Sequence, residues 1–168
     1  MVSVVITSIK NPDMSMDPSV TIHRVHEAER HLVTDLFDAY RVFYQQPSDS
    51  ARADVFLRER LESGESVIYV ALDNGQPVGF TQLYPTWSSV RTSKNWILND
   101  LFVHPEHRKK GIGEALIRQA MSFAKEQGGN WVQLETAQDN HTAQGLYEAM
   151  GFAKIDITEG CLFYRIPV

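Results

Sequence analysis

The feature that most constrains the fold is a strand, a helix and a second strand that follow one another between residues 95 and 136. Residues 95–103, NWILNDLFV, are typical of a buried strand, and residues 130–136, NWVQLET, of another. Between them, apolar residues repeat at helical spacing: Ile112, Ala115, Leu116, Ala120, Phe123 and Ala124. A connection of this kind makes its two strands parallel, with a right-handed crossover. The sequence therefore predicts an α/β protein with a mixed sheet.

The remaining elements are expected to be antiparallel neighbours or flanking helices. The pattern predicts strands at 20–25, 66–72, 77–84, 152–157 and 161–166, and helices within 27–46, 48–64 and 140–150. Asn74-Gly75 is typical of a tight hairpin turn between the second and third strands, and the last two strands should form another antiparallel pair. Residues 84–94, YPTWSSVRTSK, are expected to be a loop.

Length and charge bound the class of protein. We expect residues 20–168 to form one domain and residues 1–19, with two prolines, to be a loosely attached lead-in. A net charge of -5 argues against a nucleic-acid binder and favours a cationic small partner. No apolar run approaches the roughly 20 residues of a membrane span, and no secretory leader is evident. The expected location is the cytoplasm, where the single Cys161 would stay unpaired as a small buried hydrophobe.

Residues 104–120, HPEHRKKGIGEALIRQA, place glycines and cations where the central helix begins. A helix start presents unpaired N–H groups and roughly half a positive charge, which attract anions. Gly111 and Gly113 let the backbone approach a bulky anion, and Arg108, Lys109 and Lys110 add mobile positive charge at the rim. The stretch predicts a phosphate or pyrophosphate cradle, although a flexible turn with solvated lysines has the same composition. Standard nucleotide fingerprints fail, because Leu116 holds the third glycine position of G-x-G-x-x-G.

Two linked motifs resemble the GCN5-related N-acetyltransferase (GNAT) superfamily. Residues 108–113, RKKGIG, match its signature of Arg or Gln, two residues, Gly, any residue, then Gly or Ala. Its later motif is similar to Asn140, Ala143, Leu146-Tyr147 and Gly151-Phe152. The helix-helix-hairpin start looks most like the branch of polyamine and yeast Hpa-type acetyltransferases. The resemblance implies the GNAT acyltransferase fold: a mixed, mostly antiparallel sheet with one parallel βαβ unit, flanked by helices.

The resemblance also implies the donor substrate and its binding residues. The expected reaction is acetyl transfer from acetyl-coenzyme A to an amine by direct attack, with no metal, nucleic acid or membrane involved. The implied coenzyme A contacts are the strand edge at Leu101, Phe102 and Val103, the cradle residues Arg108, Lys109, Lys110, Gly111, Ile112, Gly113 and Glu114, and Asn140, Ala143 and Tyr147. The N–H of Val103 would stabilise the tetrahedral oxyanion. Most members pair, so a homodimer is expected.

Tyr147 sits where many family members keep the tyrosine that protonates the leaving thiolate, and taken alone it would be an ordinary core tyrosine. The general base is open. Polyamine acetyltransferases carry a glutamate at the position of Asn99, which cannot act as a base. Asp100 should point to the opposite face of its strand, and Glu135 should face the cleft between the parallel strands. Both carboxylates could equally be solvated or paired, and a water relay could replace them.

Other residues carry weaker signals. His104 and His107 form an H-x-x-H without a third metal ligand, and His141 could touch the coenzyme or face water. Tyr84 and Trp87 are candidate substrate contacts or loop packing. The acceptor could be a polyamine, a lysine-like amino acid or a protein amine. The missing acid at Asn99 leaves a second reading, a non-catalytic module that binds coenzyme A on the same fold.

Overall fold

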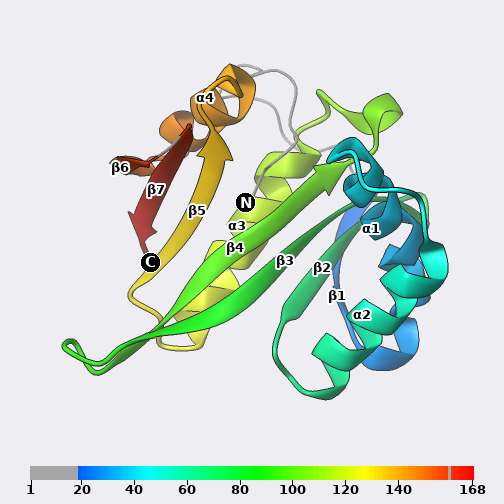
Figure 1. Ribbon diagram of the computed structural model, residues 1–168, viewed down its shortest axis with the longest axis horizontal. Helices are drawn as coiled ribbons and strands as arrows, with labels where there is room; N and C mark the ends of the chain where they lie inside the picture. Colours follow the sequence, from blue (N-terminus) through cyan, green and yellow to red (C-terminus); the bar gives the residue numbers. More distant parts are fainter. Residues whose placement is uncertain (1–18, 159) are drawn as a thin grey trace.

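The computed structural model describes residues 19–158 and 160–168 and has a seven-stranded sheet in the order β1-β2-β3-β4-β5-β7-β6 (Figure 1). The strands are β1 (Val20–Val25), β2 (Val67–Asp73), β3 (Gln76–Ser88), β4 (Ser93–Val103), β5 (Trp131–Ala137), β6 (Ala153–Thr158) and β7 (Cys161–Pro167). The helices are α1 (His31–Phe43), α2 (Ser50–Glu62), α3 (Ile112–Glu126) and α4 (His141–Ala149), with short 3-10 turns η1 (Glu27–Glu29) and η2 (Pro105–His107). This arrangement confirms the predicted mixed α/β fold.

One strand pair sets the shape of the sheet. Every neighbouring pair is antiparallel except β4 and β5, which are parallel as the strand, helix and strand order predicts. Their ladder consists of two pairs, Trp96↔Val132 and Ile97↔Gln133. Both strands continue beyond this ladder, β4 to Val103 and β5 to Ala137, and Figure 1 shows their ends diverging. The sheet therefore opens between β4 and β5 at their carboxyl ends.

The expected loop at 84–94 is wrong, because β3 and β4 form one long hairpin with only residues 89–92 as its turn. Trp87 lies opposite Lys94 in the register, and the Lys94 ammonium is 5.7 Å from the centre of the Trp87 ring. Aromatic and long cationic side chains placed directly across a ladder stabilise it, and this pairing outweighs the polar, turn-like composition. The extra strand length carries Trp87 to the end of the hairpin away from Val103.

Helices cover the two faces of the sheet and divide the core. The helices α1 and α2 pack on one face, and α3 packs on the other (Figure 1). The α1 face is aromatic, with successive ring contacts that link Phe37 to Phe80, Phe80 to Tyr40 and Tyr40 to Phe102. The α3 face is formed largely by Leu98, Leu101, Leu116, Ile117, Ala120 and Phe123, and it continues under α4 to Tyr147 and Phe152. Each strand of the centre is therefore buried on both sides.

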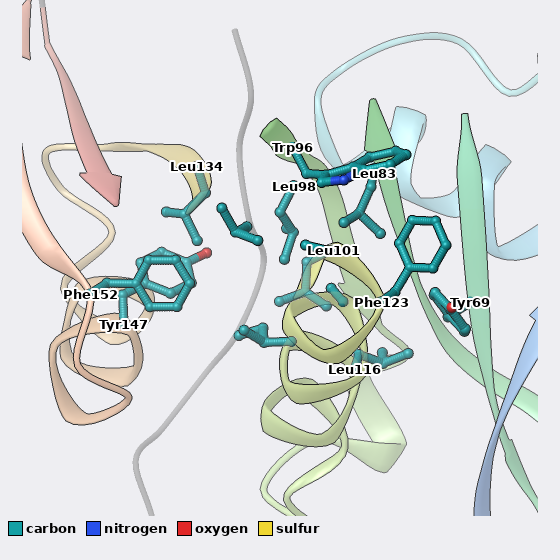
Figure 2. Close-up of a cluster of buried hydrophobic side chains, with 14 of the residues drawn as sticks. Tyr69, Leu83, Trp96, Leu98, Leu101, Leu116, Phe123, Leu134, Tyr147 and Phe152 are labelled. Carbon is teal, nitrogen blue, oxygen red and sulfur yellow. The ribbon is translucent and has the colours of Figure 1, made fainter. Parts of the chain in front are cut away.

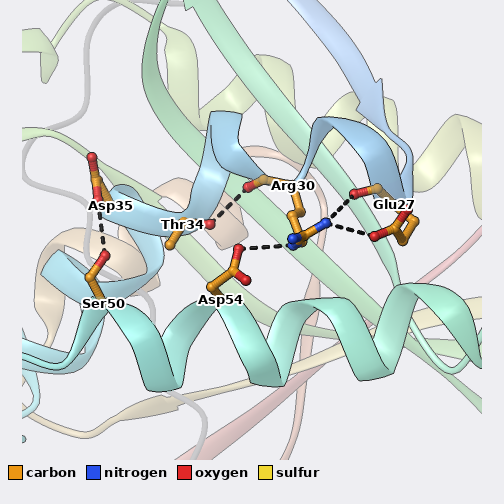
Figure 3. Close-up of polar contacts among 6 residues, drawn as sticks. All are labelled: Glu27, Arg30, Thr34, Asp35, Ser50 and Asp54. Atoms are coloured by element: carbon orange, nitrogen blue, oxygen red, sulfur yellow. Dashed lines mark hydrogen bonds and ion pairs between the residues drawn. The ribbon is translucent and has the colours of Figure 1, made fainter.

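Polar contacts fix α1 against α2 (Figure 3). Arg30 donates from Nε to Asp54 at 2.8 Å and from its guanidinium to Glu27 at 2.6 Å. Ser50 donates to the Asp35 carboxylate at 3.2 Å, close to the point where α2 begins. Asp49 caps α2 by accepting from the N–H of Arg52, so the helix begins two residues after the predicted start. These contacts hold the α1–α2 connection beside the end of β4.

The predicted lead-in at residues 1–19 lies outside the described residues, apart from Ser19. Ser19 hydrogen-bonds to Asp73 at 2.9 Å at the end of β2. None of the helices in the described part of the chain is long and apolar enough to cross a membrane.

Candidate active site

The predicted cradle is built by two left-handed residues in front of α3. Lys109 has φ +66° and Gly111, the residue that caps the helix, has φ +78°. Alternating left- and right-handed residues turn successive N–H groups toward one point, which makes an anion-binding concavity. The N–H groups of Ile112, Gly113 and Glu114 add the unpaired donors of a helix start. The geometry therefore suits a phosphate or pyrophosphate group.

We expect Gly111→Ala to weaken acetyl-coenzyme A binding roughly 5- to 30-fold, because a Cβ at positive φ costs about 1–2 kcal/mol and relaxing it turns the N–H groups away. Space is not the cause, since a Cβ there meets nothing within 4 Å. Gly75→Ala is the matched control: its φ is +81°, its surroundings are equally open, and it lies in the β2–β3 turn. Calorimetric titration that gives equal affinities for the two variants would contradict the cradle.

The expectation of three mobile cations at the rim is wrong for two of them. Arg108 donates from Nε to the carbonyl of Val103 at 2.9 Å, and burial lowers the pKa of its guanidinium. Lys110 pairs with the Asp73 carboxylate at 3.6 Å, and His107 contacts the same carboxylate at 3.2 Å. Both contacts form because the loop before α3 folds back onto the strand ends, which places Arg108 beside Val103 of β4 and Lys110 beside Asp73 of β2. Arg108 and Lys110 therefore fix the loop that forms the cradle.

Along β4, the N–H and C=O groups of successive residues point alternately toward β3 and toward the opening beside β5. The N–H of His104 bonds to the carbonyl of Val78 on β3, so the N–H and C=O of Phe102 point the same way. The backbone groups of Leu101 and Val103 consequently point toward β5, where the described β4–β5 ladder has already ended. Leu101 and Val103 therefore present their backbone groups to the opening. Phe102, which was also predicted to bind coenzyme A through its backbone, instead pairs with β3 and packs its ring on the α1 face.

Tyr147 lies on α4 at the other side of this opening. Its side chain is fully buried beside Phe152, with the two ring centres 5.7 Å apart (Figure 2). Its ring centre is also 5.6 Å from that of Tyr164. Its hydroxyl has no hydrogen-bond partner within the described chain. Burial raises the pKa of this phenol well above 10.0, so it stays protonated throughout the neutral range. A buried hydroxyl without a partner is costly, and a ligand that accepts its proton would satisfy it.

The other predicted residues of α4 have structural roles. Asn140 is the helix cap, and its side-chain oxygen accepts from the N–H of Ala143 at 3.2 Å. Ala143 is fully buried, as are Ile112 and Leu101 on the opposite side of the opening. Any contact of Ile112 or Leu101 with a ligand would therefore involve the backbone. Glu114 pairs with Arg118 at 2.6 Å on the exposed side of α3.

A β-bulge at Asn99 changes the direction of Asp100. Gln82 pairs with Asp100 and Leu83 with Leu98, so Asn99 is the extra residue. Leu98 and Leu101 both face α3, although they are three residues apart. The bulge therefore turns Asp100 to the α1 face, and Asn99 Nδ2 donates to the Asp100 carboxylate at 3.1 Å. The prediction that the two side chains lie on opposite faces is wrong for this reason.

Asp100 is buried among neutral donors. Gln82 Nε2 donates to its Oδ2 at 2.7 Å, and the Tyr40 hydroxyl also donates to the carboxylate. Its side chain is 5% exposed, and burial raises its pKa above 3.8 in spite of these hydrogen bonds. The negative charge of Asp100 in turn helps burial to raise the pKa of Tyr84. A carboxylate with a raised pKa is a better base than an exposed one.

Glu135 lies on the other side of the opening, on β5, two residues beyond the last rung of the β4–β5 ladder. Its carboxylate accepts from the Cys161 thiol, which raises the pKa of that thiol. The predicted burial of Cys161 is wrong, since Cys161 is only partly buried on β7, on the same face of the sheet as Glu135 of the neighbouring β5. A thiol with a raised pKa is a poor nucleophile.

The weaker candidates from the sequence differ in how close they lie to Asp100. Tyr84 lies close enough to Asp100 for that charge to raise its pKa, whereas Trp87 is 71% exposed at the distant end of the hairpin. The rings of His104 and His107 are 6.1 Å apart. Among the described residues, no three His, Cys, Asp or Glu side chains are grouped as metal ligands. His141 is exposed at the first turn of α4.

A cavity of about 620 Å³ lies between the end of α1 and the end of β4. On the helix side it is lined by Asp35, Ala39, Val42 and Phe43, and on the strand side by Phe102, His104 and Arg108. Because Arg108 belongs to the loop that forms the cradle, this cavity and the anion site are adjacent. Its apolar floor and exposed carboxylate suit a ligand with an aliphatic chain and a positive charge.

Sequence reasoning missed Gln82 and Tyr40. A glutamine within the otherwise apolar strand sequence GFTQLY was a usable signal, because a buried amide requires a partner. Tyr40 gave no such signal, since its place in the helical repeat is that of a core residue.

Comparison with known proteins agrees with this geometry. The model of the acetyltransferase (GNAT) family matches residues 32–152. The uncharacterized N-acetyltransferase YhfO of Bacillus subtilis is 44% identical over 133 residues, 79% of this chain and 89% of that protein. A probable acetyltransferase of Haemophilus influenzae is 34% identical over 118 residues, 70% of this chain and 79% of that protein.

Solved structures extend the comparison. A crystal structure of a probable acetyltransferase superposes with a TM-score of 0.77 and 35% identity, over 83% of this chain and 93% of that one. Arabidopsis thaliana NAA60 in complex with acetyl-CoA has a TM-score of 0.71 at 16% identity, over 89% and 98% of the two chains, and shows the shared fold. With the family model covering most of the chain, the conclusion is direct: the protein belongs to the GNAT acetyltransferase family and is an N-acetyltransferase.

Proposed function

We propose that this protein transfers the acetyl group of acetyl-coenzyme A directly to a primary amine. The observation that carries the proposal is the opening between β4 and β5, which has the cradle of α3 at one end and the Tyr147 hydroxyl, unpaired among the described residues, along one side. A pyrophosphate in the cradle would let the pantetheine arm extend along Leu101 and Val103 as an added strand. The thioester would then lie between β4 and Tyr147.

The residues divide the proton transfers between them. The amine nitrogen bonds to the thioester carbon, and the N–H of Val103 stabilises the resulting oxyanion. The C–S bond then breaks, and Tyr147 gives its proton to the departing thiolate. Before the attack, the ammonium form of the acceptor gives one proton to Asp100 on the α1 side of β4. After the C–S bond breaks, the nitrogen loses its second proton, which restores the Tyr147 phenol. Because Asp100 has its pKa raised by burial, it can hold the first proton more readily than an exposed carboxylate.

We propose a cationic acceptor with an aliphatic chain, such as a polyamine or a lysine-like amine. The cavity beside the cradle supports this class, because Val42 and Phe43 offer apolar surface next to the exposed Asp35 carboxylate. A net charge of -5 favours the approach of a cation. The non-catalytic alternative is not favoured, since Asp100 replaces the acid that Asn99 lacks.

An acceptor panel tests the proposed function. Thiol release from acetyl-coenzyme A is measured with diamines, polyamines, lysine, lysine peptides and peptides whose only amine is the N-terminus. We expect release above hydrolysis with aliphatic primary amines and a higher KM for them in Asp35→Asn. Tight binding of acetyl-coenzyme A without release for any amine would contradict the proposal.

A further inference from the structure

Two hydrogen-bond acceptors lie side by side on the α1 face of β3 and β4. One is the Asp100 carboxylate, and the other is the carboxamide oxygen of Gln82, whose Nε2 donates to Asp100 at 2.7 Å. The Gln82 side chain is fully buried, and its oxygen has no partner in the described chain. Leaving a buried amide oxygen unpaired costs about 1–3 kcal/mol, so the arrangement is incomplete as it stands.

The Asp100 carboxylate also lacks a partner for its charge, because no cation among the described residues pairs with it. Its hydrogen-bond donors are neutral: the amides of Gln82 and Asn99 and the hydroxyl of Tyr40. The titratable groups that face it are the phenols of Tyr40 and Tyr84, and no Lys or Arg within the described ranges pairs with it. A buried carboxylate is ordinarily paired with a cation. Within the described residues, Gln82 Oε1 therefore lacks a hydrogen-bond donor and the Asp100 carboxylate lacks a positively charged one. A protonated amine supplies both.

We infer that Gln82 and Asp100 together form the subsite for the nitrogen of the acceptor amine. One N–H of a primary amine donates to Gln82 Oε1 while another faces the Asp100 carboxylate. Gln82 thus determines specificity for primary amines and also positions Asp100 through its Nε2. A secondary amine loses one of these hydrogen bonds once it has given its proton to Asp100. The inference rests on the proposed function for its substrate class and adds the residue that recognises it.

Kinetics separate this role from a structural one. In Gln82→Met, which keeps the length of the side chain, we expect kcat/KM for a primary amine to fall roughly 10- to 100-fold. The KM for acetyl-coenzyme A should change by less than about twofold. Preference for the primary amine over its N-methyl derivative should be lost. Gln76→Met, at the exposed start of β3, is the matched control and should behave as wild type. Unchanged kcat/KM and unchanged preference in Gln82→Met would overturn the inference.

Binding to the wild-type protein tests the subsite without turnover. Nuclear magnetic resonance follows the assigned side-chain amide of Gln82 while a primary amine is added in the presence of coenzyme A. We expect a saturable shift of that signal, and a weaker one with the N-methyl derivative. If the amide shifts but no amine is acetylated, the proposed function fails and the subsite stands. If amines are acetylated while the amide signal stays unchanged, the subsite fails and the proposed function stands.

Discussion

Replacing Tyr147 by Phe should lower kcat roughly 100- to 1,000-fold, with little change in the KM for acetyl-coenzyme A. The reason is that the hydroxyl supplies the proton for the leaving thiolate, and loss of a general acid costs about this factor. Stability should hold or rise slightly, because the hydroxyl is fully buried and forms no hydrogen bond within the described residues. Steady-state kinetics and thermal unfolding measure both effects.

Tyr164→Phe is the control for this result. Tyr164 packs against Tyr147 at 5.6 Å and is equally buried, but its hydroxyl donates to Glu148 at 3.0 Å. This variant should lose about 1 kcal/mol of stability and keep turnover near wild type. Opposite effects in two neighbouring tyrosines would separate chemistry from packing. Wild-type turnover in Tyr147→Phe would remove Tyr147 from the mechanism.

Replacing Asp100 by Asn should lower kcat/KM for the amine roughly 100- to 10,000-fold at neutral pH, because asparagine cannot accept the proton of the amine. Glu135→Gln is the comparison, since Glu135 is the other carboxylate at the opening and is engaged by the Cys161 thiol. We expect only a small loss in Glu135→Gln. A larger loss in Glu135→Gln than in Asp100→Asn would reverse the assignment, and small losses in both would point to a water relay.

The same Asp100→Asn variant should be more stable than wild type at neutral pH. The folded protein raises the pKa of Asp100 above 3.8, so folding favours the protonated acid. This contribution is fully present below about 3.8, the unfolded value, and is lost as the pH rises through the folded pKa. The gain in Asp100→Asn should therefore shrink as the pH falls toward 4. Chemical denaturation at several pH values measures the difference.

Much of the fold follows from local sequence patterns. The parallel β4–β5 pair was predictable because a helix links two apolar strands, and Asn74-Gly75 marked the β2–β3 turn. The β3–β4 hairpin was not, since the pairing of Trp87 with Lys94 exists only in the final register. Local composition shows which residues favour turns, but it does not show which residues will face each other on paired strands.

The candidate site likewise has features that the sequence predicts and features that it does not. Gly111 and the start of α3 were predictable because helix geometry alone presents N–H groups there. The bulge at Asn99 had a faint signal, the change of apolar parity between Leu98 and Leu101. Burial of β4 on both faces hides that signal, because apolar residues occupy both parities. The anchoring of Arg108 depends on how the loop folds onto Val103, which sequence spacing does not determine.

The most direct test of the account is a single-turnover reaction with isotopically labelled acetyl-coenzyme A and a primary amine from the panel, analysed by mass spectrometry. We expect one labelled acetyl group on the amine for each coenzyme A released, and none on the protein, because the amine attacks the thioester directly. Label on the protein before it reaches the amine, or released coenzyme A without any acetylated amine, would contradict it.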